Sequence, residues 1–133
     1  MNTAKFKGYE FRGGEREGLK RLEEYIFGTK SISHYAKTRN ALDGLNFASK
    51  LSPWIANGTL SIRKVYHEAL RFEKEFGHEA SVKKFIDELF WRDFARFYCL
   101  KNGTKIFFEY GVSNRGPHRW ETDQNKINKW CQG

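Results

Sequence analysis

The chain has 133 residues and a formal net charge of +8, and aromatic residues make up 17% of it. That length permits one domain, and so many aromatic side chains exclude a chain that is disordered over most of its length. No run approaches the roughly 18 apolar residues of a membrane-spanning helix, so we expect no membrane contact. Two cysteines are too few for a disulfide framework and indicate reduced thiols in an intracellular protein. The positive charge favours an anionic partner such as nucleic acid, although a solvated basic surface explains it equally well.

The first part of the chain predicts two helices separated by a loop. Apolar residues recur at helical spacing over residues 15–27, which predicts an amphipathic helix that ends at Gly28. Residues 29–50 lack this spacing, and we expect a loop with at most a short helical turn near residues 33–38. Ser52, which a proline follows, is expected to be the N-cap of a second, short helix.

Two longer helices are predicted in the middle of the chain. Ser61 is expected to cap a helix that ends near Phe76. Ser81 is expected to open the most strongly amphipathic helix, which ends near Leu100. The apolar stripe of this helix comprises Val82, Phe85, Ile86, Leu89, Phe90, Phe94, Phe97 and Tyr98.

The C-terminal part is expected to be a loop followed by a short helix. Glycines and a proline interrupt residues 103–122, and we expect Ile106–Phe108 to anchor this loop in the core. A final helix over residues 123–131 should turn Ile127 and Trp130 inward. Since no segment alternates with period two for long, the sequence predicts an all-α fold.

A loop with two hydroxyl groups and a lysine precedes the predicted short helix, and its residues are Ser49, Lys50, Leu51 and Ser52. Free backbone N–H groups and the positive end of the helix dipole at such a junction suit a phosphate group. The alternative, which the pattern alone favours, is that Ser52 only caps its helix.

Glu88, Trp91, Arg92 and Ala95 share one face of the predicted long helix, because residues three and four apart are neighbours on a helix. A carboxylate, an indole and a guanidinium on one face can bind a flat, polar ring compound. A Glu88–Arg92 ion pair beside a core tryptophan explains the spacing slightly better. The four histidines show no metal-ligand spacing, so no metal site is expected.

Motifs from most of the chain together resemble one known family. In chain order they are Gly13–Ile26, Tyr35–Gly44, Ser49–Trp54, Leu60–Ser61, Val65–Tyr66, Glu88–Phe94, Trp120 and Trp130–Gly133. The resemblance is to the cryptochrome/photolyase flavoproteins, most closely the DASH-type cryptochromes, and it covers about residues 11–133. Each motif alone is modest, whereas several of them in the same order and spacing are specific.

The resemblance implies a helical domain that binds FAD. In the family, residues matching Tyr35 and the Ser49–Ser52 loop hold the flavin nucleotide, whereas Ala48 replaces the hydroxyl residue that is usual at its position. Residues matching Glu88 and Arg92 line the flavin and substrate cavity. The full set that the resemblance assigns to FAD is Tyr35, Ser49, Lys50, Leu51, Ser52, Phe85, Glu88, Arg92 and Ala95.

The resemblance also assigns roles in the reaction. The residue matching Trp91 stacks on damaged pyrimidines, and the resemblance places Glu88 and Trp130 near the same substrate. Trp120 matches the outermost tryptophan of the series that carries electrons to the excited flavin. The implied reaction is blue-light-driven electron transfer from flavin to a pyrimidine dimer, often in single-stranded DNA, with light sensing as the related role.

The resemblance further implies that residues 1–133 form a single partial FAD-binding domain. The family's N-terminal α/β antenna domain and the C-terminal half of its flavin pocket have no counterpart in this sequence. We therefore expect weak or absent FAD binding and an apolar patch that a protein partner covers. The side chains expected to be exposed there are those of Trp54, Trp91, Trp120 or Trp130. The alternatives are a non-enzymatic helical module that binds nucleic acid or protein, and a gene fragment without function.

Overall fold

The computed structural model describes residues 4–6, 9–41, 44–113 and 122–133. The chain divides into two compact units, Met1–Asp93 and Phe94–Gly133. The strands and helices are β1 (Ala4–Phe6), β2 (Tyr9–Phe11), α1 (Glu15–Glu23), a π-helical turn (Glu24–Gly28), a 3₁₀ turn (Ser31–His34), α2 (Tyr35–Thr38), α3 (Ser52–Ala56), α4 (Ile62–Phe76), α5 (Glu79–Asn102), a second 3₁₀ turn (Gly103–Phe107) and α6 (Gln124–Gln132).

Helices make up most of the regular structure in the described part of the chain, which confirms the predicted all-α fold. The addition is a short antiparallel hairpin, β1–β2, in which Phe6 pairs with Tyr9. Strands of three residues are too short to show an alternation of period two, so the sequence pattern did not predict them.

The first helix has the predicted extent but a wider final turn. α1 continues into the π-helical turn, where the N–H of Thr29 donates a hydrogen bond of 2.7 Å to the carbonyl of Glu24. Gly18 of α1 lies against Trp54 of α3, and a Cβ atom added at Gly18 would lie 3.0 Å from Cγ of Trp54. The absence of a side chain at Gly18 therefore lets α1 and α3 pack closely.

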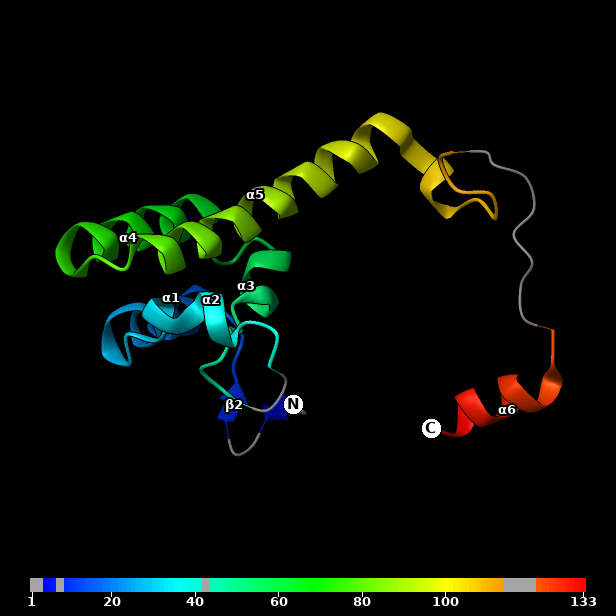
Figure 1. The fold of residues 1–133 in the computed structure, drawn as a ribbon, viewed down its shortest axis with the longest axis horizontal. Helices are drawn as coiled ribbons and strands as arrows, with labels where there is room; N and C mark the ends of the chain where they lie inside the picture. The colour runs from blue at the N-terminus through cyan, green and yellow to red at the C-terminus, as the bar shows by residue number, and fades with distance from the viewer. Residues whose placement is uncertain (1–3, 7–8, 42–43, 114–121) are drawn as a thin grey trace. The chain divides into compact units, whose positions relative to one another are not determined.

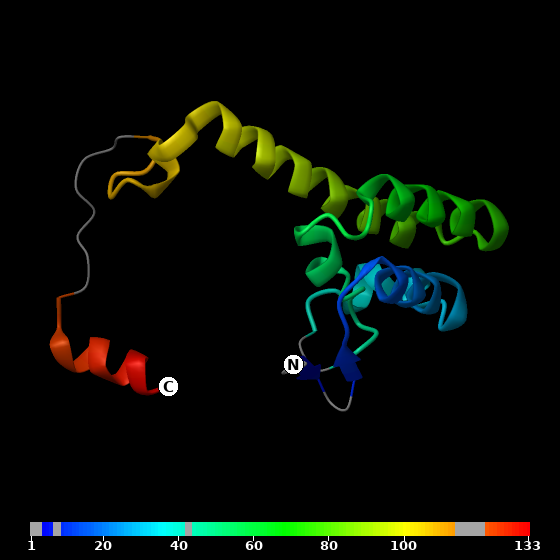
Figure 2. The ribbon, with the colours of Figure 1, turned by 180° about the vertical axis from the view of Figure 1, so that it is seen from behind.

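The core of the first unit lies where α4 and the first turns of α5 run side by side, next to α1 and α2 (Figures 1 and 2). The buried apolar side chains are Leu22, Tyr25, Ile26, Ile32, Tyr35, Leu51, Trp54, Leu60, Val65, Ala69, Phe72, Val82, Phe85 and Ile86. The apolar stripe of α4 and the first part of the α5 stripe thus form the core, as their periodicity predicts.

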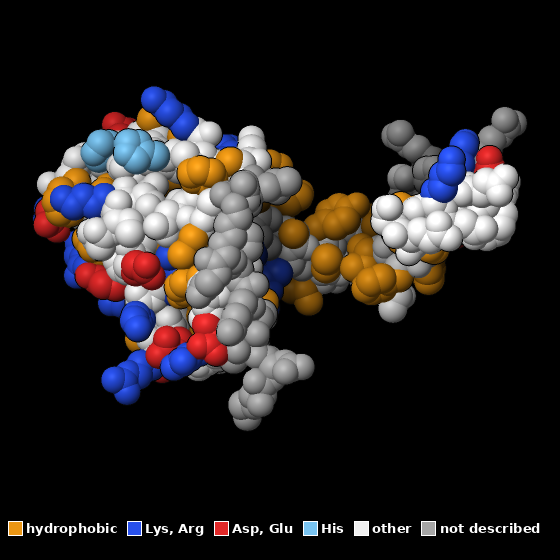
Figure 3. Space-filling model, turned by 90° about the horizontal axis from the view of Figure 1, so that it is seen from below, with side chains coloured by type: hydrophobic (Ala, Val, Ile, Leu, Met, Phe, Trp, Pro, Cys, Tyr) orange, Lys and Arg blue, Asp and Glu red, His pale blue; other side chains and the backbone are white. Residues whose placement is uncertain are grey.

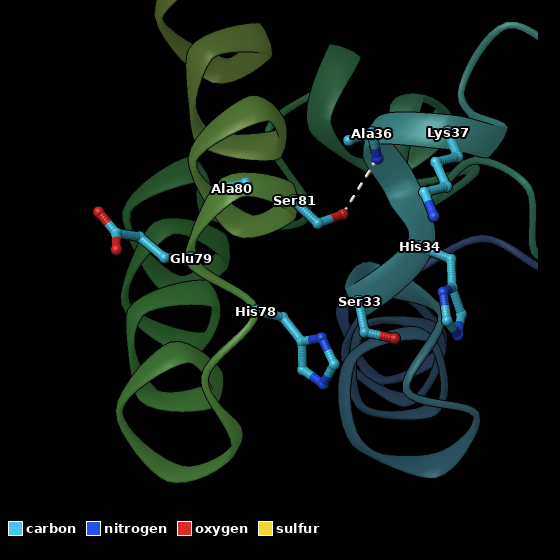
Figure 4. Close-up of a pocket in the computed structure, with 8 residues that line it drawn as sticks. All are labelled: Ser33, His34, Ala36, Lys37, His78, Glu79, Ala80 and Ser81. Carbon is cyan, nitrogen blue, oxygen red and sulfur yellow. Dashed lines mark hydrogen bonds between the residues drawn. The ribbon is translucent and has the colours of Figure 1, made fainter.

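The predicted start of the longest helix is wrong. α5 begins at Glu79 rather than at Ser81, directly after His78, whose φ is 63°. Ser81 is buried inside the helix, where its Oγ donates to the carbonyl of Ile32 (2.7 Å) and accepts from the N–H of Ala36 (3.0 Å; Figure 4). A serine that looks like a cap in the sequence therefore satisfies two backbone groups of another segment.

The other two predicted caps differ from each other. Ser52 is the first residue of α3 and Leu51 is its N-cap, so the prediction that Ser52 caps this helix is wrong. Ser61 does occupy the N-cap of α4, with an extended backbone whose carbonyl accepts from the N–H of Val65 (3.1 Å). Its hydroxyl makes no capping hydrogen bond. The prediction for Ser61 was therefore correct in the position of the cap but not in its side-chain hydrogen bond.

Side chains of the second unit that were expected to be buried are exposed. Phe107 and Phe108 are exposed, so the predicted anchor in the core is wrong. Trp130 of α6 is 84% exposed, so its predicted inward orientation is wrong as well. None of the described residues of this unit is buried, and these side chains therefore have no core of their own to enter.

The four tryptophans named as candidates for exposure have different environments. Trp91 is 61% exposed and Trp130 is exposed, as predicted. Trp54 is buried, and its Nε1 donates to the carbonyl of Arg12 (3.0 Å), so the expectation of exposure is wrong for this residue. Trp120 lies outside the described residues.

Candidate functional site

A buried arginine holds the Ser49–Ser52 loop, whose sequence predicts phosphate binding. Arg21 of α1 has no exposed surface. Its guanidinium donates three hydrogen bonds of 3.0 Å, to the carbonyl of Leu45, Oδ1 of Asn46 and the carbonyl of Ser49. The sequence carries no signal for this residue, because arginines are seldom fully buried and Arg21 lies among other charged residues of the helix.

The end of this loop has a constrained backbone. Lys50 has a φ of 56°, in the left-handed region that side chains other than glycine seldom adopt. Leu51 is buried, and its carbonyl accepts hydrogen bonds from the N–H groups of Trp54 and Ile55 (both 3.1 Å). The left-handed residue thus turns the chain from the loop into α3.

The two hydroxyl groups of the loop are available to a ligand. Neither Oγ of Ser49 nor Oγ of Ser52 has a hydrogen-bond partner among the described residues. Ser52 is exposed and Ser49 is half-buried.

A second hydrogen bond also fixes the loop, because Oγ1 of Thr38 at the end of α2 donates to the carbonyl of Phe47 (2.8 Å).

Tyr35 and Phe85, both predicted to contact the cofactor, meet in the core. Their rings pack edge to face, with centroids 5.2 Å apart, and the ring centroid of Tyr25 lies 6.2 Å from that of Phe85. Burial raises the pKa of Tyr35, and the carboxylate of Glu88 raises it further, whereas Arg39 opposes both. Tyr35 therefore stays a neutral phenol at physiological pH.

Glu88 does not form the expected pair with Arg92. Its carboxylate pairs with Arg39, which follows α2, and lies 3.6 Å from Nζ of Lys84. Arg92 pairs with its neighbour Asp93 at 2.8 Å instead. The simpler interpretation of this face, an intrahelical Glu–Arg pair beside a core tryptophan, is therefore wrong.

The structure brings together only part of the predicted site. Tyr35, Phe85 and Glu88 form one cluster of the first unit, and Arg92 lies one turn beyond Glu88. Ala95 and Trp130 belong to the second unit, where both are exposed. Trp120, the predicted electron-transfer residue, lies outside the described residues.

One pocket lies apart from these residues. A shallow hollow of about 330 Å³ is lined by Ser33, His34, Ala36, Lys37, His78, Glu79, Ala80 and Ser81. Figure 4 shows that the Glu79 side chain points away from it, and the hydroxyl of Ser81 is already bonded to Ala36.

Among the described residues, no three His, Cys, Asp or Glu side chains are grouped as a metal site. No helix of the described ranges is long and apolar enough to cross a membrane.

Comparisons with known proteins identify relatives of the chain. No model of a known protein family matches it. It is 41% identical over 123 residues to cryptochrome DASH of Synechocystis sp., and 38% identical over 122 residues to cryptochrome DASH of Danio rerio. A crystal structure of Synechocystis sp. PCC6803 cryptochrome matches 90% of this chain with a TM-score of 0.84 and 41% identity. The chain is homologous to one part of cryptochrome DASH.

The resemblance seen in the motifs is thus confirmed, and the fold is that of the helical domain of cryptochromes and photolyases. The matches cover 92% of this chain in both curated relatives but only 25% and 23% of those relatives. The chain therefore spans about a quarter of the length of the cryptochrome DASH proteins it matches. One related cryptochrome DASH, from Ostreococcus tauri, is named chloroplastic/mitochondrial and is 37% identical over 124 residues.

Proposed function

We propose that this chain supplies part of the FAD-binding site of a cryptochrome DASH. The observation that carries the proposal is the Ser49–Ser52 loop, which Arg21 holds from one side and which offers two unpaired hydroxyl groups. Homology to cryptochrome DASH over most of the chain supports FAD as the ligand. The same proposal includes the light-driven electron transfer of the cryptochrome/photolyase family and its DNA substrate.

The groups that the loop offers suit a diphosphate. The carbonyl of Ser49 points at Arg21, and all described peptide bonds are trans, so the N–H of Lys50 points the opposite way. Backbone N–H groups and the hydroxyls of Ser49 and Ser52 are the donors that protein sites use for phosphate oxygens. Lys50 and Leu51 lie between these two serines and belong to the proposed FAD-binding segment.

The face of α5 that carries Glu88 and Arg92 suits a polar ring. Both side chains are half-buried and held by partners, the first by Arg39 and the second by Asp93. Ion pairing fixes the direction of a carboxylate and a guanidinium before a ligand arrives, which lowers the entropy cost of binding. Phe85 lies one turn before Glu88 on the same side of α5, where it is buried against Tyr25 and Tyr35.

For the whole cryptochrome DASH protein we propose light-driven electron transfer for the repair of pyrimidine dimers or for light sensing. Bound FAD would supply the absorption of light and the transferred electron. The loop and Tyr35 would bind the nucleotide, Trp91 and Trp130 would stack on bases of single-stranded DNA, and Trp120 would pass electrons. Since this chain holds only part of such a site, we expect it to bind FAD weakly and to catalyse little.

A titration with FAD tests the proposal. We expect saturable quenching of flavin fluorescence by the chain, and about a tenfold loss of affinity in the Ser49→Ala/Ser52→Ala double variant, because two hydroxyl donors to phosphate are removed. Ser61→Ala is the matched control, since Ser61 also lies at a helix N-terminus and its hydroxyl makes no capping bond. A wild-type chain that shows no saturable binding up to about 1 mM FAD contradicts the proposal.

A second proposal concerns the apolar surface of the second unit, and a separate observation favours it. Phe97, Leu100 and Trp130 are 69%, 78% and 84% exposed, and Figure 3 shows many exposed hydrophobic side chains outside the first unit. Exposed apolar surface of this kind is typical of a contact with another polypeptide. The partner that we propose is the remaining part of a cryptochrome DASH chain, because the relatives are about four times as long as the matched segment.

Association in solution tests this second proposal. The segment of Synechocystis cryptochrome DASH outside the match, produced separately, should form a complex with this chain in sedimentation experiments. Phe97→Asp should abolish the complex, whereas Arg96→Asp on the same helix should weaken it little, since only the first change places a charge on the apolar surface. No complex with the wild-type chain, or an equal effect of both changes, contradicts the proposal. Salt-dependent binding of single-stranded DNA by the same surface is the competing outcome.

A further inference from the structure

We propose that Arg21 is the positioning residue of the phosphate loop: its buried guanidinium fixes residues 45–49 so that the loop can accept a diphosphate. The inference rests on the proposed FAD site and adds to it a residue to which the family resemblance assigned no role. Arg21 lies on α1, 24 to 28 residues before the groups it binds. It would act through the loop rather than touch the ligand.

The charge of Arg21 interacts with groups inside the protein, because the side chain is buried. The side chain has no exposed surface, and Oε2 of Glu24, at 3.3 Å, is the carboxylate paired with it in the described part of the chain. The rings of Tyr9 and Tyr25 lie 5.6 and 5.5 Å from its Cζ. Burying a guanidinium is costly unless its donors are satisfied, so the loop acceptors are needed for Arg21 to stay buried.

The geometry of the bonds makes Arg21 a template for the loop. All three of its nitrogens are used, with Nε on the carbonyl of Ser49, Nη2 on the carbonyl of Leu45 and Nη1 on Oδ1 of Asn46. A planar fork fixes the relative positions of its acceptors, whereas a lysine presents a single flexible charge. Three bonds from one rigid group therefore determine both ends of a five-residue segment.

The orientation of these carbonyls decides what the loop presents to a ligand. Arg21 attracts the carbonyl oxygens of Leu45 and Ser49, and an unbound carbonyl oxygen would repel a phosphate. With both oxygens turned toward the guanidinium, the N–H groups of Asn46 and Lys50 point to the other side. Without Arg21 these two peptide units can rotate, and the loop loses its preference for an anion.

The Arg21→Lys variant separates the positioning of the loop from a general effect on stability. It keeps the charge and the aliphatic stem but removes the planar guanidinium. We expect amide hydrogen exchange to become at least about tenfold faster in residues 45–50 while α4 keeps its protection, since only the loop loses its bonds. The affinity for FAD should fall about tenfold, whereas the affinity for riboflavin, which has no phosphate, should change less than about twofold.

Two further variants complete the experiment. Arg16→Lys makes the same change at an exposed position of α1 and should change neither exchange nor affinity. Asn46→Ala removes one of the three acceptors and should loosen the loop less than Arg21→Lys.

Unchanged exchange in residues 45–50 of the Arg21→Lys variant would overturn the inference, and so would equal acceleration in the loop and α4. A parallel loss of FAD and riboflavin binding would overturn it as well. If the wild-type chain binds no FAD, the proposed function fails, while the exchange measurement still decides whether Arg21 holds the loop.

Discussion

Helix α5 is buried at its beginning and exposed at its end. Ser81, Val82, Phe85 and Ile86 are its buried residues, and all lie in the first third of the helix. Phe94, Phe97 and Leu100 recur with similar spacing in the last turns, yet they are exposed. The first turns run beside α4, whereas the second unit contains no buried residue among those described. Apolar periodicity therefore shows which side chains are suited to burial, and the structure shows which of them are buried.

The largest expected effect compares two phenylalanines of this helix. Phe85→Ala should lower the free energy of unfolding by about 3–5 kcal/mol, because it leaves a cavity among Tyr25, Tyr35 and other buried rings. Phe97→Ala removes the same side chain from an exposed position and should change it by less than about 0.5 kcal/mol. Urea unfolding followed by far-ultraviolet circular dichroism measures both.

Similar losses for the two variants would break the comparison, since they would show that Phe97 is covered in solution. The concentration dependence of unfolding then distinguishes a second copy of the chain from folding within one chain, because only association makes the transition depend on concentration.

A smaller effect is expected at Ser81. Ser81→Ala should lower the free energy of unfolding by about 1–3 kcal/mol, because the buried carbonyl of Ile32 and the N–H of Ala36 each lose a partner. Ser113→Ala is the control from the second unit, where the serine is exposed, and it should have no measurable effect. Differential denaturation of the two variants reports the difference. Equal stability of the Ser81→Ala variant and the wild type would mean that water replaces both bonds.

The smallest effect is expected from the buried phenol of Tyr25. Its hydroxyl has no hydrogen-bond partner among the described residues, and burial raises its pKa above the usual value near 10. Tyr25→Phe removes an unsatisfied polar group, so we expect the free energy of unfolding at neutral pH to rise by up to about 1 kcal/mol. Tyr98→Phe, at an exposed position of α5, should leave it unchanged.

Tyr25 also predicts that the free energy of unfolding falls as the pH rises into the alkaline range. A phenol with a raised pKa in the folded state binds its proton more tightly there than in the unfolded chain. Its contribution to stability is therefore complete below about pH 10 and is lost as the pH rises through the folded-state value. The wild-type chain should lose stability in alkaline solution, and Tyr25→Phe should lose less of it, because the pKa values of Tyr35 and Tyr9 are also raised by burial and these residues still contribute. Parallel curves for the two proteins would show that Tyr25 is not the titrating group.

The sequence predicted helices well because each carries its own periodic signal. The ranges of α1 with its π-helical turn, and of α4, required only local patterns and a glycine at the end. Ser81 shows where such reasoning fails, since its partners, Ile32 and Ala36, lie 49 and 45 residues away and no local pattern contains them. The predicted cap at Ser61 and the wrong one at Ser81 have the same local appearance.

Only part of the candidate site was predictable from the sequence. Its residue types were predictable through the family resemblance, and the structure brings Tyr35, Phe85 and Glu88 together. The partner of Glu88 was not predictable, because Arg39 approaches it from another segment rather than from one helical turn away. Arg21 was missed for the opposite reason, since a charged residue on a charged helix gives no sign that it is buried.

The position of Ser81 has a consequence for how much of the chain must be synthesised before it can fold. Every buried residue in the described part of the chain lies at or before Ile86, so a polypeptide ending at Asp93 keeps all of that core. A nascent chain that ends before Ser81 still lacks Val82, Phe85 and the partner of the Ile32 carbonyl. Stable folding of the first unit must therefore wait until the opening turns of α5 have left the ribosome, whatever follows them.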